Sequence, residues 1–112
     1  MFIARVKGHV VATMKDSSIN GLKLLIVEPL KVDYTDNAAA AKGDEAGGGG
    51  GSLGVTNRAI VALDIIGAGE GQLVLVVQGS SARMASGMSK VPTDAVVIGI
   101  VDEAMVMGKR VE

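Results

Sequence analysis

Residues 2–14, FIARVKGHVVATM, alternate between apolar and polar side chains along most of their length. Apolar or small residues fill the even positions, Phe2, Ala4, Val6, Gly8, Val10, Ala12 and Met14. The odd positions include Arg5, Lys7, His9 and Thr13. Successive side chains of a strand point to opposite faces, so this period of two predicts a β-strand with one buried face and one face in water.

Four more strands are expected further along the chain, over residues 22–32, 56–66, 72–78 and 94–102. The turn sequence KDSSING (15–21) precedes the second strand, and GAGEG (67–71) precedes the fourth, since Asn and Gly tolerate positive φ. Pro29 implies an edge or a bulge near the end of the second strand. Residues 79–87, GSSARMASG, predict a short helix with Ser80 or Ser81 as the cap of its first turn.

Residues 38–54, AAAAKGDEAGGGGGSLG, differ in composition from the rest of the chain. They hold seven of the 16 glycines and a single large apolar side chain, Leu53. Glycine loses the most backbone entropy on ordering and supplies nothing to pack. We therefore expect a flexible Ala/Gly-rich loop at about 38–54 inside one domain that spans residues 1–112.

The composition excludes several classes of function. Eleven Lys and Arg residues against 12 Asp and Glu residues give a charge of −1, which offers no electrostatic footprint for nucleic acid. The absence of Cys and the presence of one His argue against thiolate and His-based metal sites, and no cofactor is expected. No apolar run approaches the ~20 residues of a spanning helix, so a soluble, cytoplasmic chain without a membrane partner is expected.

Five strands and one short helix before the last strand predict an all-β fold, a small OB-like antiparallel barrel of five strands. Residues 73–77 are apolar on both faces, and so is most of 95–101. A small barrel has one inner face, so the outer sides of these strands need a cover. We expect copies of the same chain to supply it, because the short helix offers little surface.

Two motifs resemble sites with chemistry but lack essential parts. GAGEG has Gln72 where the dinucleotide fingerprint needs a third glycine, and a strand follows in place of a helix. GSSAR (79–83) has Arg83 where the nucleophile elbow needs glycine. A helix start assisted by Arg83 can hold an anion, although a structural ion pair of Arg83 explains the same residues. We therefore expect no enzyme and no catalytic residue.

Several blocks of the sequence follow one another in a specific order. The opening strand has the form IARV-x-G-x-VV-x-T-x-K over 3–15, and GLKLLIV follows at 21–27. Gly67-Ala68-Gly69 leads into Val74-Leu75-Val76, residues 79–83 have the form GS-x-AR, and PTDAVV at 92–97 leads to Val101-Asp102. In this order the blocks resemble the EutN/CcmL family of bacterial microcompartment vertex proteins. The Ala/Gly-rich insertion departs from the pattern.

This resemblance implies an OB-like barrel that forms a homopentamer at the five-fold vertices of a microcompartment shell, beside hexameric shell proteins. An alternative of another class is an OB-fold binding module for single-stranded nucleic acid or a small anion. Such modules use aromatic platforms and a basic groove, whereas this chain has one Phe, one Tyr and no Trp.

We predict that the segment between the last two strands lies at the subunit interface or lines a central pore. The predicted residues are Gly79, Ser80, Ser81, Ala82, Arg83 and Asp94. A guanidinium at a subunit boundary can pair with a carboxylate, and Asp94 is the candidate partner of Arg83.

Overall fold

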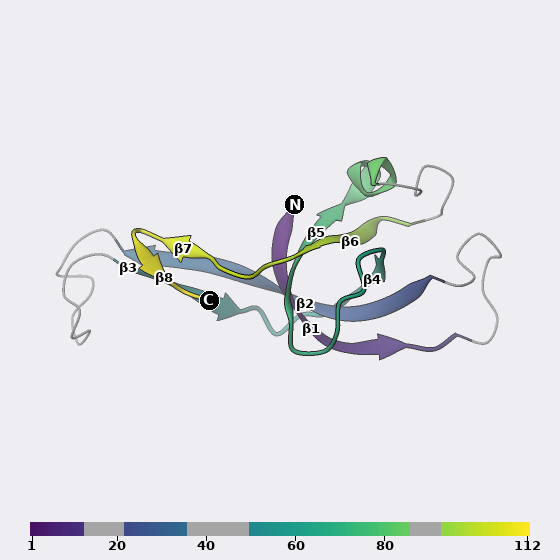
Figure 1. Cartoon of the computed structure of the whole chain (residues 1–112), viewed down its shortest axis with the longest axis horizontal. Helices are drawn as coiled ribbons and strands as arrows, with labels where there is room; N and C mark the ends of the chain where they lie inside the picture. The colour runs from purple at the N-terminus through teal and green to yellow at the C-terminus, as the bar shows by residue number, and fades with distance from the viewer. Residues whose placement is uncertain (13–21, 36–49, 86–92) are drawn as a thin grey trace.

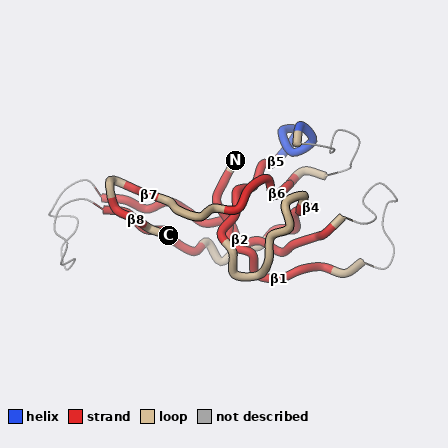
Figure 2. The backbone as a smooth tube through the Cα atoms, in the orientation of Figure 1, coloured by secondary structure: helices blue, strands red, loops and turns tan. Residues whose placement is uncertain are grey.

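The computed structural model describes residues 1–12, 22–35, 50–85 and 93–112, with the side chains of 34, 35, 50, 81 and 83 excepted. Strand dominates these residues (Figures 1 and 2). The elements are β1 (Phe2–Val10), β2 (Lys23–Thr35), β3 (Gly50–Val55), β4 (Ile60–Asp64), β5 (Leu73–Gln78), the 3₁₀ helix η2 (Gly79–Met84), β6 (Ala95–Ile100), β7 (Met105–Val106) and β8 (Lys109–Arg110). The predicted turn at 15–21 lies outside the described residues.

Five strands close into a barrel in the order β1-β5-β6-β4-β2, and β2 pairs back onto β1. The predicted small OB-like barrel is thereby confirmed. One pair, β4 with β6, is parallel, through Leu63 opposite Val96 and Asp64 opposite Val97. An odd number of strands cannot alternate direction all the way around a closed ring, so a barrel of five strands must contain a parallel pair.

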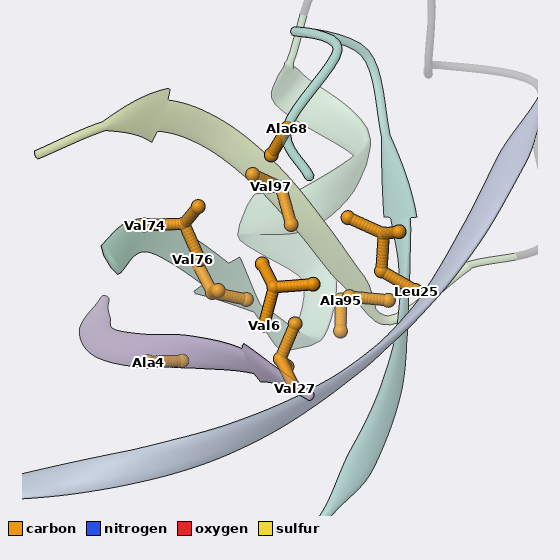
Figure 3. Close-up of a cluster of buried hydrophobic side chains, with 10 residues drawn as sticks. Ala4, Val6, Leu25, Val27, Ala68, Val74, Val76, Ala95 and Val97 are labelled. Carbon is orange, nitrogen blue, oxygen red and sulfur yellow. The ribbon is translucent and has the colours of Figure 1, made fainter. Parts of the chain in front are cut away.

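Small side chains fill the interior of the barrel (Figure 3). The buried cluster consists of Ala4, Val6, Leu25, Val27, Ala62, Ala68, Val74, Val76, Ala95 and Val97. The alternation predicted for the first strand is confirmed where it can be followed. Ala4 and Val6 are fully buried, whereas Lys7 and His9 are exposed. Beyond Val10 the strand ends, and Met14 lies outside the described residues.

Beyond the barrel, the far end of β2 pairs with β3 from Leu30 opposite Val55 to Thr35 opposite Gly50. We call this pair, residues 30–35 and 50–55, the arm; it projects away from the barrel (Figure 1). The predicted flexible loop at 38–54 is therefore wrong for residues 50–54, which are strand. Gly51 permits this because its missing Cβ makes room for the Val106 side chain.

The third predicted strand, over 56–66, is shorter than expected because its first residues form a connection between β3 and β4. Asn57 has a φ of 59°, and its N–H donates to the Glu28 carboxylate at 2.8 Å. The Thr56 hydroxyl donates to the carbonyl of Pro29 at 2.6 Å. Pro29 itself lies where β2 changes partner, between Val27 opposite Ile60 in β4 and Leu30 opposite Val55 in β3.

Residues 103–112 form a second small sheet of β7 and β8 that sequence analysis did not predict. We call them the C-terminal hairpin. Its turn residues Met107 and Gly108 have φ values of 51° and 78°, the signs that a two-residue type I′ turn requires. The hairpin lies against β3 of the arm (Figure 1), and its last residue, Glu112, pairs with Arg5 of β1 at 3.0 Å.

Gly51→Ala tests whether the close approach of the C-terminal hairpin needs glycine. The added Cβ would overlap the Val106 side chain, so we expect the free energy of unfolding to fall by about 1–3 kcal/mol, the usual cost of overpacking. Urea unfolding at one fixed protein concentration measures the change.

Gly54→Ala is the matched control in the same strand. Its Cβ would meet the outer parts of the Lys31 and Asp33 side chains, which are exposed and can move aside. An equal loss in both variants would show that the Val106 contact is not the cause.

Candidate subunit interface

The segment predicted to serve the subunit interface forms η2, a 3₁₀ helix of six residues in place of the longer helix expected over 79–87. Residues 86 and 87 lie outside the described part. Gly79 opens the segment with a φ of 69°, a conformation that favours glycine. Its N–H donates to the carbonyl of Asp94 at 2.7 Å, which ties the start of η2 to the residue before β6.

Neither predicted serine caps this helix. The N-cap position is Gln78, in extended conformation, and no side chain makes a cap hydrogen bond. Ser80 lies inside the first turn and is exposed. The Asp94 carbonyl satisfies the first N–H of the helix, that of Gly79.

The Ala82 side chain packs against the outer side of the barrel and is fully buried within the chain itself. It packs with Leu63 and Val96 in a second buried cluster on the outer side of the barrel. The Ala82 side chain is thus occupied within the chain, and the prediction that residue 82 lies at a subunit boundary or a pore stays a prediction. The short helix also covers part of the outer side of the last strands, because η2 packs on Val96.

This outer cover is incomplete. Around the second cluster, six apolar side chains are only partly buried, namely Leu22, Leu24, Ile65, Val77, Ala85 and Ile98. On η2 itself, the Met84 side chain is 86% exposed. Val61 of β4 and Ile66 after β4 are also exposed. The outer side of the barrel thus keeps apolar surface in water around the predicted interface segment.

The remaining predicted residues are placed only in part. Asp94 is exposed, and its backbone is joined to Gly79. The roles predicted for the Ser81 and Arg83 side chains, including the ion pair with Asp94, lie outside what the structure describes.

A second apolar face lies on the arm, and sequence analysis missed it. Leu30 stands opposite Val55 and Val32 opposite Leu53, so the four share one face. Val32 and Val55 are 50% and 57% exposed, and Met105 and Met107 of the C-terminal hairpin are about as exposed. The alternation of Leu30, Val32 and Tyr34 beyond Pro29 was the signal that β2 continues past the barrel.

Two other polar side chains, those of Asp64 and His9, make contacts that stabilise the fold. The buried Asp64 carboxylate accepts from the N–H groups of Ile66, Gly67 and Ala68 at 2.8–3.1 Å. It thereby holds the GAGEG segment as the tight turn that was predicted, with positive φ at Gly67 and Gly71. His9 lies on the polar face of β1, and its Nδ1 is 3.4 Å from the Glu70 carboxylate.

Among the described residues, no three His, Asp or Glu side chains gather as a metal site would require. No helix in the described part of the chain has the length and apolar character needed to cross a membrane.

Comparison with known proteins places these features in a family. The family model for the ethanolamine utilisation protein EutN/carboxysome matches residues 1–102. The shell vertex protein PduN of Salmonella typhimurium is 40% identical over 102 residues, which cover 91% of this chain and 96% of PduN.

Two solved structures share the fold over nearly the whole chain. CcmL of Gloeobacter violaceus has a TM-score of 0.74 and 36% identity, covering 98% of this chain and 94% of CcmL. GrpN of Rhodospirillum rubrum, described as a pentameric microcompartment shell protein, has a TM-score of 0.70 and 34% identity, covering 96% of this chain and 100% of GrpN.

The barrel and the order of the sequence blocks therefore have a common explanation: this chain belongs to the EutN/CcmL family of bacterial microcompartment shell vertex proteins.

Proposed function

We propose that this chain is a non-catalytic structural protein that assembles as a homopentamer and caps the five-fold vertices of a microcompartment shell in the bacterial cytoplasm. One observation carries the proposal. GrpN, described as pentameric, matches this chain over 100% of its own length with a TM-score of 0.70. The match also covers 96% of this chain, so it extends beyond any single element of the fold.

The distribution of apolar side chains supports assembly. Closed rings form through a heterologous contact, in which two different surfaces of one chain meet and the rotation closes. This chain exposes apolar side chains in two separate places, on the arm and around η2 on the outer side of the barrel. In the barrel, by contrast, every member of the interior cluster is buried.

Native mass spectrometry of the purified chain tests the proposed stoichiometry. We expect a single main species with the mass of five chains of 11.3 kDa each. A stable monomer at micromolar concentration, or a closed ring with another number of copies, would contradict the proposal.

We further propose that Gly79, Ser80, Ser81, Arg83 and Asp94 lie at the subunit boundary or line the central opening. The support is their position. They belong to, or are tied to, a short helix that packs on the outer side of the barrel, beside an apolar surface that the chain covers only in part. Arg83 is the residue of this group best suited to bidentate pairing with a carboxylate.

Arg83→Ala tests this placement. Truncation of a buried interfacial charge typically costs about 2–5 kcal/mol, and a ring repeats that loss at each contact. We expect the variant to dissociate on dilution at concentrations where the wild type remains assembled, with an unchanged far-UV circular dichroism spectrum. Arg58→Ala, in the exposed connection between β3 and β4, is the control for removal of an arginine. An Arg83 variant as stable to dilution as the wild type would remove the segment from the interface.

The partners proposed for the outer rim of the pentamer are hexameric shell proteins. Hexagonal tiles alone form a flat sheet, and pentagonal units are needed to close it. Co-expression with hexameric shell proteins should therefore yield closed polyhedra by electron microscopy, whereas omission of this chain should leave open sheets or tubes. Closed shells in both cases would contradict the capping role.

A further inference from the structure

The C-terminal hairpin is attached to the rest of the subunit at three places. Just before it, the Val101 N–H donates to the Leu73 carbonyl of β5 at 2.8 Å. Midway, the Val106 side chain occupies the space above Gly51 of the arm. At its end, the Glu112 carboxylate accepts hydrogen bonds from both terminal nitrogens of the Arg5 guanidinium, at 3.0 and 3.3 Å.

The hairpin is also closed on itself. Its two short strands pair Met105 with Arg110, and the Val111 N–H donates to the Ala104 carbonyl at 2.9 Å. Arg110 donates to the Glu112 carbonyl at 2.9 Å and lies 3.9 Å from the Glu103 carboxylate. These bonds stiffen the ten-residue segment, so that fixing it at one attachment also restricts its position at the next.

Arg5 makes the last of these three attachments. Its guanidinium binds Glu112 and also donates to the carbonyl of Gly71, in the turn that leads into β5. One side chain of β1 thereby joins the barrel wall, a barrel turn and the end of the hairpin. The hydrogen bond and the charge of Arg5 hold the pKa of Glu112 below its ordinary value.

An arm of two strands has little stability of its own, because isolated two-stranded ribbons are marginal in water. The described part of the arm joins the barrel through the continuous strand β2 and through the connection from β3 to β4, which is hydrogen-bonded to Pro29 and Glu28 of that same strand. A further connection, to another strand of the barrel, would restrict bending at this stretch of β2, and the C-terminal hairpin supplies one through Arg5 of β1.

We propose that the C-terminal hairpin is a strap that fixes the arm relative to the barrel, with Arg5 and Glu112 as its anchor. The strap sets the position at which the arm presents Val32 and Val55. The importance of that position for ring formation rests on the function proposed above, but the strap itself is a property of the single subunit.

Hydrogen exchange by mass spectrometry on the full chain tests the strap. Glu112→Ala removes the anchor, and Glu103→Ala is the matched control, since it removes a carboxylate that pairs only within the hairpin. In the Glu112 variant we expect amides of residues 50–55 and 105–111 to exchange about two- to fivefold faster, the range that an exposed ion pair can supply. Amides of β5 and β6 and all amides of the control should keep wild-type rates. Unchanged exchange in the arm, or an equal rise in the barrel, would overturn the proposal.

Met107→Asn tests the same strap in the opposite direction. Asn adopts positive φ more readily than Met in a type I′ turn, so the hairpin should tighten and its amides should exchange more slowly. Faster exchange in the arm of this variant would contradict the proposal.

The strap and the proposed function fail separately. Exchange is compared at a concentration where native mass spectrometry finds the same number of copies in each variant. If the wild type is pentameric and Glu112→Ala leaves the exchange rates of the arm amides unchanged, the strap is refuted and the pentamer is not. If the wild type is monomeric and the arm amides exchange faster in the Glu112→Ala variant, the pentamer is refuted and the strap is not.

Discussion

The interior of this subunit is narrow, and that constraint governs the rest of the structure. A closed barrel of five strands encloses a space that Val and Ala fill almost alone, with Leu25 as the largest side chain in its buried cluster. Larger residues at these positions would force the strands apart and break the pairing of β1 with β2 and β5. The scarcity of aromatic residues, one Phe and one Tyr in 112, suits so small an interior. A core this small also leaves many apolar side chains with no place inside.

Those side chains lie on the outside of the barrel, where the chain itself covers some of them and leaves others exposed. Within the chain, η2 folds back so that Ala82 covers Leu63 and Val96. The remaining apolar surface, around Met84 and along the arm, stays in water in the single subunit. A high mean hydropathy, +0.41, in a small chain thus reflects surface as well as core. The proposed pentamer would give this surface a partner, since other copies of the chain would then lie against it.

The fold was predictable from the sequence where one local rule decides the outcome. The alternation around Ala4 and Val6 marks a strand, and the glycines at 67 and 71 mark a turn, because each pattern has a single structural reading. The arm was not predictable by such rules. Residues 50–55 have the composition of a loop, and they become strand because the far end of β2 supplies a partner and Val106 needs the space that Gly51 leaves free. Both causes are tertiary contacts.

The candidate site divides in the same way. The position of Gly79 to Arg83 between the last two barrel strands follows from the chain order, and the sequence located it. The burial of Ala82 does not follow, because it depends on the distance between η2 and β4, which the sequence does not encode locally. Nor do the anchor of Arg5 on Glu112 and the bond from Asn57 to Glu28, since each joins residues from distant parts of the chain.

Closure of the barrel has a consequence for how the chain comes into being on the ribosome. β1 pairs with β5 through Phe2 opposite Val76, and β4 pairs with β6 through Leu63 opposite Val96. β1 is synthesised well before β5, so its second edge stays unpaired in the meantime, and the ring of hydrogen bonds is complete only when β6 has emerged. Folding dominated by such distant pairings is slow, and unpaired apolar edges invite aggregation meanwhile. Folding of each subunit is thus a competition between closure of the barrel and aggregation of its unpaired strand edges.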